Sequence, residues 1–213
     1  MTGGMRRAAS ARRRRWSTIE RELRRSGGAL IAGIDEVGRG SLAGPVVACA
    51  IIMPPDARAL RGVDDSKRLA PSERERLAQL ILDRALDIGL GAASTHEIDR
   101  LNIYHASVLA MRRALSRLTT APDHVLVDGL PLRTLGRAHI AIVQGDDRCY
   151  NIACASIVAK VTRDRLMARL ARRHPDYCWE RNCGYATAAH IAGLAVHGPT
   201  RHHRRTFLVK ALA

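Results

Sequence analysis

Aromatic residues and long apolar runs are both scarce in this chain of 213 residues. Phe, Tyr and Trp together make up 3% of the sequence, so the hydrophobic core must be built mainly from Ala, Leu, Val and Ile. The longest apolar stretch, Leu42 to Pro55, is interrupted by Gly44 and Pro45 and is too short to span a bilayer. The first 28 residues contain arginines but no apolar segment of the kind that a secretory signal requires. We therefore expect a cytoplasmic protein that does not associate with membranes.

Cysteine is sparse as well, and its spacing lacks the pattern of a metal site. The chain contains five cysteines: Cys49, Cys149, Cys154, Cys178 and Cys183. Two CxxxxC pairs occur, but no CxxC or CxxH accompanies them, which argues against bound zinc. An odd number of cysteines without a paired framework indicates free thiols in a reducing compartment.

Acidic residues are a minority, because 20 Asp and Glu stand against 35 Lys and Arg, which gives a formal charge of +15. Only three of the basic residues are lysine, and the other 32 are arginine. The planar guanidinium pairs with phosphate oxygens through two hydrogen bonds, so this composition favours a polyanionic partner such as nucleic acid. A general bias of composition toward arginine on a solvated surface is the alternative.

The arginines are densest in residues 1–28, which contain nine of them against Glu20 and Glu22. Four are consecutive at positions 12–15, and the segment ends in Ser-Gly-Gly at positions 26–28. This composition predicts a disordered basic arm over residues 1–28. Three roles fit such an arm: binding nucleic acid without sequence preference, improving solubility, or directing import into an organelle. The two glutamates argue against the last role.

Hydrophobic patterning over the remaining residues alternates between strands and helices. Strands are predicted at residues 30–35, 46–53, 88–93, 124–129 and 139–143. Helices are predicted at residues 71–86, 95–118, 153–173 and 187–197. Strands first, and alternating strands and helices later, indicate an α/β fold with a mixed sheet. Gly, His and Arg become more frequent after residue 173, so we divide the chain into a core of residues 29–173 and a C-terminal helical segment of residues 174–213.

Three acidic residues lie where strands are predicted to end. Asp35 and Glu36 follow an apolar strand, and Gly38 and Gly40 allow the irregularity that lets both carboxylates approach one ligand. Asp128 ends a second apolar strand, at the carboxyl edge where open α/β sheets bind ligands. The alternative for Asp128 is a simple Asp-Gly turn.

A fourth acidic residue, Asp164, lies on a polar stripe of the helix predicted at 153–173. Ser156, Lys160 and Asp164 are spaced by four residues and therefore share one helix face. A surface pair between Lys160 and Asp164 is the simpler alternative. Four carboxylates gathered in one site would repel one another strongly, and two divalent cations would neutralise them. Such an arrangement is used for phosphodiester cleavage.

A series of motifs occurs in a fixed order along residues 29–208. The motifs read AGIDEVGRG at 32–40, LAGPVV at 42–47, DSK at 65–67, HEID at 96–99, VDG at 127–129, ASIVAKVTRD at 155–164, GY at 184–185 with Thr187 and His190, and HRR at 203–205. In this order they closely resemble the ribonuclease HII family. Three positions depart from the family's pattern: Ser41 stands where proline is frequent, Ala186 interrupts the usual Gly-Tyr-Pro-Thr, and Cys154 replaces a usual small residue.

The resemblance implies a ribonuclease H-like fold, which is an α/β architecture with a mixed five-stranded sheet flanked by helices and a helical C-terminal segment. It also implies an endoribonuclease that hydrolyses the RNA strand of RNA/DNA hybrids. Such an enzyme cuts 5′ to single ribonucleotides embedded in duplex DNA and leaves 5′-phosphate and 3′-hydroxyl ends. Its partners would be RNA/DNA hybrids and duplex DNA containing ribonucleotides, and a monomer is expected. Ribonuclease HIII, the most similar other enzyme, carries an extra N-terminal domain for which 28 residues are too few.

The resemblance assigns the acidic residues by position. Asp35, Glu36, Asp128 and Asp164 match the four active-site carboxylates, which serve both as catalytic residues and as metal ligands. Two Mg²⁺ or Mn²⁺ ions are implied, since oxygen ligands select hard cations, and Asp164 would serve the second ion.

Contacts with the substrate are assigned in the same way. Gly38, Arg39 and Gly40 match the loop that reads the ribose 2′-hydroxyl, the group that distinguishes RNA from DNA. Tyr185 matches the residue that packs on the following deoxyribose. Four further residues are expected to contact phosphates or carboxylates: Ser66, Lys67, Ser156 and Lys160.

Two other functions compete with this interpretation. One is a basic module that binds hybrids but has lost cleavage, and the other is a nuclease of the same fold that acts on DNA junctions. All four acidic residues are present, which argues against the first. Neither alternative explains the loop Gly38-Arg39-Gly40.

Overall fold

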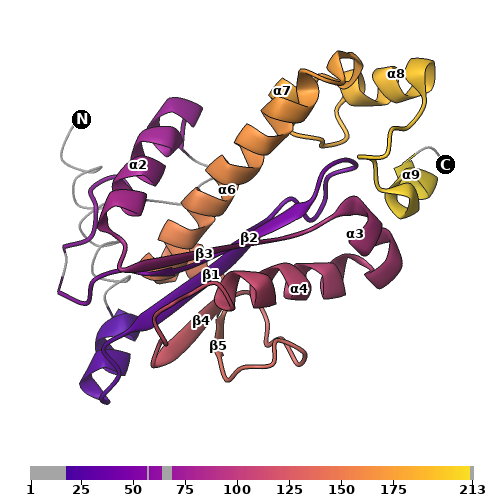
Figure 1. Cartoon of the computed structure of the whole chain (residues 1–213). Helices are drawn as coiled ribbons and strands as arrows, with labels where there is room; N and C mark the ends of the chain where they lie inside the picture. Colours follow the sequence, from indigo (N-terminus) through magenta and orange to yellow (C-terminus); the bar gives the residue numbers. More distant parts are fainter. Residues whose placement is uncertain (1–17, 57, 64–68, 212–213) are drawn as a thin grey trace.

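A central sheet of five strands organises the computed structural model, which describes residues 18–56, 58–63 and 69–211 (Figure 1). β1 (Ile31–Val37) pairs antiparallel with β2 (Val46–Ile52), and β2 pairs antiparallel with β3 (Asp87–Ala93). On the other side of β1, β4 (His124–Asp128) pairs parallel with β1, and β5 (Ile140–Ile142) pairs parallel with β4. The resulting order is β3-β2-β1-β4-β5, so the mixed five-stranded sheet expected from the sequence is confirmed.

Helices cover both faces of this sheet (Figure 1). α6 (Tyr150–Ala171) packs on β1 and β2, and α2 (Pro71–Arg84) packs on α6. α4 (Ile103–Leu115) packs on β2 and β3 from the opposite side. None of the helices in the described residues is long and apolar enough to cross a membrane.

Small residues let the layers approach closely in this aromatic-poor core. Along β2, Cys49 and Ile51 join the apolar cluster beneath α6, whereas Ala48 and Ala50 join the cluster beneath α4, as strand alternation requires. In β1, a Cβ atom at Gly33 would lie 2.2 Å from the backbone carbon of Asn151 in α6. A side chain there would separate the helix from the sheet, so close backbone approach replaces aromatic bulk as the means of packing.

The single helix predicted at residues 95–118 is wrong, because the structure contains two helices there. α3 (Thr95–Leu101) and α4 are separated at Asn102, whose φ of 67° is incompatible with a continuous helix. The Asn102 side chain accepts the His105 N–H at 3.2 Å and so caps α4. Ser94 caps α3 through a capping box with Glu97. The apolar stripe continues across the break, which is why periodicity alone did not reveal it.

The C-terminal part consists of short helical elements, as expected. They are η1 (Pro175–Tyr177), α7 (Trp179–Asn182), α8 (Ala188–His197) and α9 (Arg205–Ala211). A further short helix, α5 (Gly145–Arg148), precedes α6 in the core. Trp179, Tyr177 and Leu194 pack with Leu42 and Met167 in a separate apolar cluster. This cluster attaches the C-terminal segment to the end of α6 and to the chain that joins β1 to β2.

Residues 18–25, which the composition assigned to a disordered arm, form a helix that packs on the core. Ile19 and Leu23, spaced by one helical turn, pack against the apolar cluster that contains Ile31. Glu20 is 3% exposed, and its Oε1 accepts both the backbone and the side-chain N–H groups of Asn151 at 2.8 Å. The arm therefore cannot extend to residue 28, and positions 1–17 lie outside the described residues.

Glu20→Ala is expected to lower the free energy of unfolding by about 1–3 kcal/mol, because two buried donors of Asn151 lose their acceptor. Glu22→Ala is the matched control, since Glu22 is exposed on the same helix and should change stability by less than about 0.5 kcal/mol. Urea unfolding at pH 7 measures both. Equal effects in the two variants would show that the helix does not unfold together with the core.

Candidate active site

Strands β1 and β4 lie side by side, and three carboxylates occur near their C-terminal ends. The parallel register pairs Ile34 with Val127, so Asp35 and Asp128 are the next residues of neighbouring strands. Glu36 follows Asp35 on β1. Asp35 is 8% exposed, and the other two are half-buried. The sheet thus brings together three of the acids that sequence patterning predicted at strand ends.

The charges of these three side chains act on one another. Burial raises the pKa of Asp35 well above its usual value, and the Glu36 and Asp128 carboxylates raise it further. A hydrogen bond from Ser156 opposes this shift, as does the Glu36 N–H, which lies 2.7 Å from Asp35 Oδ1. Desolvation and like-charge repulsion therefore both disfavour the ionised form of Asp35 in the absence of a cation.

Glu36 and Asp128 have additional fixed partners. Burial also raises the pKa of Glu36, although Arg39, whose Nη1 lies 3.0 Å from Glu36 Oε1, lowers it. Asp128 Oδ1 accepts the N–H of Gly145, the first residue of α5, at 2.6 Å. The Asp128 side chain is therefore oriented by the backbone that follows β5.

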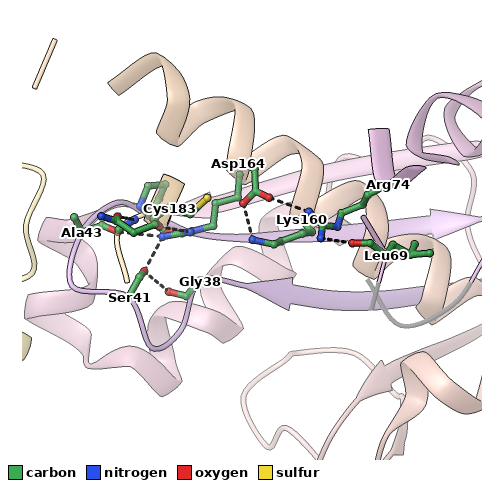
Figure 2. A network of polar contacts seen from close by, with 12 residues as sticks. Gly38, Ser41, Ala43, Leu69, Arg74, Lys160, Asp164 and Cys183 are labelled. Carbon is green, nitrogen blue, oxygen red and sulfur yellow. Dashed lines mark hydrogen bonds and ion pairs between the residues drawn. The ribbon is translucent and has the colours of Figure 1, made fainter. Parts of the chain in front are cut away.

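Asp164 lies on α6 between two cations (Figure 2). Its Oδ1 is 2.7 Å from Lys160 Nζ, and its Oδ2 is 3.4 Å from Nη1 of Arg74 on α2. The side chain of Cys183 is adjacent, and burial, followed by the Asp164 carboxylate, raises the pKa of that thiol. Asp164 thus makes the pair with Lys160 that helix spacing predicted, and its charge is balanced by basic side chains.

The chemistry of the donor set fits a hard divalent cation. The acidic side chains offer only oxygen atoms, and a cation would relieve the repulsion that acts on Asp35. In the arrangement seen here, no group of three or more His, Cys, Asp or Glu side chains is close enough to hold an ion within the described ranges. In this arrangement the Glu36 carboxylate is paired with Arg39 and the Asp164 carboxylate with Lys160. All five cysteines are free, as expected.

A buried arginine holds the loop that follows β1. Arg204 is fully buried, and its guanidinium donates to the carbonyl oxygens of Gly38 at 2.6 Å, Arg39 at 2.7 Å and Gly44 at 2.9 Å. Burial, together with the nearby charge of Arg163, lowers the pKa of Arg204 to about 9. The backbone of the Gly38-Arg39-Gly40 segment is therefore held in place by the Arg204 side chain, which is 166 residues from Gly38 in the sequence.

A second buried arginine, Arg163 on α6, holds the same loop. Its guanidinium donates to the carbonyl oxygens of Pro45, Cys183 and Ala43 at 2.9–3.0 Å. It also donates to Ser41 Oγ at 2.6 Å, and that hydroxyl donates to the Gly38 carbonyl at 3.0 Å. Ser41, which departs from the family's frequent proline, therefore adds two hydrogen bonds that proline cannot make.

Tyr185 lies beside this loop on the segment between α7 and α8. It is 37% exposed, and the Arg163 guanidinium carbon lies 5.8 Å from the centre of its ring. Its backbone N–H donates to Asn182 at 2.9 Å, and its carbonyl accepts the Thr187 N–H at 2.8 Å. The preceding Gly184 carbonyl accepts the Leu42 N–H at 2.8 Å, which joins the two segments. A partly exposed aromatic ring therefore lies beside the loop that follows β1.

The family model described as Ribonuclease HII matches residues 32–210 of the chain. The chain belongs to that family. It is therefore a hydrolase and a ribonuclease.

Known ribonuclease H proteins resemble this chain in sequence and in fold. Ribonuclease HII from Granulibacter bethesdensis is 54% identical over 207 residues, which cover 95% of this chain and 94% of that protein. The crystal structure of ribonuclease H2 from Pyrococcus horikoshii OT3 matches with a TM-score of 0.71 at 25% identity, over 85% of this chain and 96% of that one. Bst-RNase HIII, solved in complex with Mn²⁺, shares the fold with a TM-score of 0.71 at 19% identity, over 92% and 72% of the two chains.

Some site residues of this ribonuclease HII were missed by sequence reasoning, and others lie outside the described residues. Arg163 and Arg204 lie within the motifs, but the sequence does not indicate their roles; the only signal is that Arg163 follows Lys160 by three positions and so flanks its helix face. Ser156 and Lys160 both contact carboxylates, those of Asp35 and Asp164. Ser66 and Lys67 fall in residues 64–68, which the structure does not describe.

Proposed function

We propose that this ribonuclease HII hydrolyses the RNA strand of RNA/DNA hybrids and cuts 5′ to single ribonucleotides in duplex DNA, leaving 5′-phosphate and 3′-hydroxyl ends. The observation that carries the proposal is the combination of electrostatically coupled carboxylates with an arginine-braced glycine loop. The carboxylates supply the means of hydrolysis, and the loop supplies a rigid backbone edge beside them. The surplus of arginine supports a duplex nucleic acid as the partner.

Two divalent cations, Mg²⁺ or Mn²⁺, belong to this proposal. Asp35, Glu36 and Asp128 would hold the first ion, and Asp164 would contribute to the second. When bound, such ions activate water and stabilise the charge that develops on the phosphate. Hydrogen bonds from Ser156 and from the Glu36 N–H orient the Asp35 carboxylate. The Gly145 N–H orients the Asp128 carboxylate. Lys160 balances the charge of Asp164 in the absence of an ion. The Mn²⁺ complex of a protein with this fold supports the choice of ion.

The two glycines of the loop differ in a way that supports a ribose contact. A Cβ at Gly38 would lie 2.1 Å from Nε of Arg163, so this side of the loop packs on protein. A Cβ at Gly40 would meet no atom within 4 Å, so that position is open. We infer that the sugar approaches at Gly40, where the backbone is unobstructed, and that Gly38 serves the shape of the loop.

Incubation of the purified protein with duplex DNA containing one ribonucleotide, in Mg²⁺ and separately in Mn²⁺, tests the proposal. We expect a single cut on the 5′ side of the ribonucleotide, none in the all-DNA duplex, and none in EDTA. Binding without cleavage would favour a hybrid-binding module. Cleavage of branched DNA without ribonucleotides would favour a junction nuclease.

Tyr185→Ala is expected to reduce kcat/KM about tenfold or more on a single embedded ribonucleotide. An aromatic side chain that stacks on one nucleotide contributes roughly 1–3 kcal/mol, and alanine removes that contact. Tyr185→Phe should retain activity, because the ring face rather than the hydroxyl makes the contact. On long hybrids, repeated 2′-hydroxyls should lessen the loss.

The informative quantity is therefore the ratio of kcat/KM for the two substrates. Tyr104→Ala, at a tyrosine of similar exposure (38%) on α4, is the matched control and should leave the ratio unchanged. An equal loss on both substrates in Tyr185→Ala would make Tyr185 a packing residue.

A further inference from the structure

Two histidines that the catalytic proposal does not use are buried against each other beneath the Tyr185 segment. His190 lies on α8 and is 0% exposed, and His203, which forms a bridge with Ala43, is 2% exposed. Their Nε2 atoms are 3.0 Å apart. The indole Nε1–H of the buried Trp179 donates to His190 Nε2, also at 3.0 Å.

The neighbours of this pair determine where each proton resides. The backbone N–H of Thr200 donates to His203 Nδ1 at 2.9 Å, so Nδ1 is an acceptor and a neutral His203 carries its proton on Nε2. That proton points at His190 Nε2, whose single lone pair is shared between it and the Trp179 indole N–H. His190 must then carry its own proton on Nδ1, and this atom lies 2.9 Å from the Tyr185 carbonyl oxygen. The chain of hydrogen bonds ends at the backbone of Tyr185.

Both rings are in surroundings that keep them neutral. Burial lowers the pKa of His190, and burial together with His190 lowers the pKa of His203 to about 4. His174 and His202 face the same region and act in the same direction on His203. No proton therefore enters the pair near neutral pH, and the two tautomers are fixed.

At its His203 end, this network of hydrogen bonds also reaches the Gly38–Gly40 loop. His203 is followed by Arg204, whose guanidinium donates to the Gly38 and Arg39 carbonyls. The backbone N–H of Arg204 donates to the Leu42 carbonyl at 2.8 Å. The two surfaces proposed to contact sugars, the Tyr185 ring and the glycine loop, are thus tied to two consecutive residues, 203 and 204.

We propose that His190 and His203 are positioning residues: their fixed tautomers set the placement of Tyr185 relative to the Gly38–Gly40 loop and thereby determine preference for a ribonucleotide followed by DNA. The inference rests on the proposed function of Tyr185 and the loop. The histidines touch neither substrate nor reacting atoms, and they act through the Tyr185 carbonyl on one side and the Arg204 backbone on the other.

Two substitutions of His190 separate its two hydrogen bonds. In His190→Asn the amide N–H occupies the place of Nδ1–H and can still donate to Tyr185, while the acceptor for Trp179 is lost. In His190→Gln the amide oxygen reaches the place of Nε2 and can accept from Trp179 and His203, while the donor to Tyr185 is lost. Each variant keeps one half of the network, so similar losses of stability are expected.

The readout is the preference ratio, which is kcat/KM for an embedded ribonucleotide divided by kcat/KM for a long hybrid. We expect His190→Asn to stay within about threefold of the wild-type ratio and His190→Gln to lose roughly tenfold, the effect of one buried hydrogen bond. Equal ratios in both variants, with activity following the folded fraction, would overturn the positioning role. That result would leave the proposed function standing, because the wild-type enzyme would still show the preference.

A spectroscopic measurement on the wild-type protein provides a test that needs no variant to fold. Nitrogen-15 spectra of the imidazole rings distinguish the tautomers, and we expect a proton on Nδ1 of His190 and on Nε2 of His203 near pH 7. The opposite tautomer at His190, or a charged ring at either position, would contradict the proposed chain of hydrogen bonds. This outcome is independent of whether the enzyme cleaves embedded ribonucleotides.

Discussion

The Asp35→Asn variant is expected to lower kcat/KM on duplex DNA with one ribonucleotide by about 10³-fold or more, even in saturating Mg²⁺. The amide keeps an oxygen that can accept the Glu36 N–H, so the local geometry is retained. It lacks the negative charge that holds a hard cation, and the loss corresponds to about 4 kcal/mol of transition-state stabilisation. Asp128→Asn should behave in the same way, because the two residues lie at neighbouring positions near the C-terminal ends of adjacent parallel strands.

The same substitution is expected to stabilise the metal-free protein. The pKa of Asp35 is raised in the folded state, so the folded protein binds more protons at this site than the unfolded chain. Its contribution to stability is complete below the unfolded pKa of about 3.9 and is lost as the pH rises through the folded pKa. In EDTA the wild type should therefore lose stability above about pH 4 relative to Asp35→Asn.

Single-turnover cleavage and urea unfolding in EDTA between pH 4 and pH 8 measure the two effects. Asp83→Asn, which removes one carboxylate bonded to Gln79 on the exposed face of α2, is the control and should match the wild type in both assays. If Asp35→Asn retained near wild-type turnover in Mg²⁺, the assignment of the metal ligands would be incorrect. If it were less stable than the wild type at pH 7, the repulsion inferred here would not govern the site.

The Gly38→Ala and Gly40→Ala variants are both expected to lose cleavage activity, but for different reasons. Gly38 has a φ of +89°, and a Cβ there would lie 2.1 Å from Nε of Arg163, so alanine should displace the buried guanidinium. A strained backbone of this kind costs about 1–3 kcal/mol, and cleavage of every substrate should fall along with stability. A Cβ at Gly40 would have open space, so stability should change by less than about 0.5 kcal/mol.

The Gly40→Ala variant then isolates the substrate contact. A methyl group at the point where the ribose approaches should lower kcat/KM about tenfold or more, a change of roughly 1.4 kcal/mol, while the unfolding midpoint stays constant. Thermal unfolding and cleavage of an embedded ribonucleotide by the same preparations provide the comparison. Full activity of Gly40→Ala would show that the sugar does not approach there, whatever Gly38→Ala does.

Strand patterning and strand ends were the parts of this protein that sequence could predict. A buried strand can be recognised from its own run of apolar residues. An acidic residue near the C-terminal end of such a strand lies at the sheet edge where ligands bind, so Asp35 and Asp128 could be placed before the fold was known. Asp164 was predicted from helix spacing together with Lys160, and its second partner, Arg74 on α2, required the tertiary structure.

Features that depend on the backbone conformation of one residue, or on contacts distant in sequence, could not be predicted. The break at Asn102 lies within a continuous apolar stripe, and only its left-handed backbone reveals it. Glu20 counted as a charge in an arginine-rich segment, yet its acceptor role depends on Asn151, which is 131 residues away. The roles of Arg163 and Arg204 depend on the backbone carbonyls that they bind. Every residue has such a carbonyl, so residue types do not show which carbonyls a buried guanidinium will contact.

The long sequence separation between Gly38 and Arg204 has a consequence for how the enzyme matures during synthesis. β1, β2 and β4 emerge early and can pair, since folding proceeds from the N-terminus as the chain is made. The glycine loop acquires its final shape only when residue 204 has emerged and its side chain has entered the interior. A nascent or C-terminally clipped chain would therefore carry the acidic residues of β1 and β4 without the arginine that holds the glycine loop. The loop is the last of these parts to reach its final conformation, and a protease acting near residue 200 would release it while leaving the residues of the sheet in the chain.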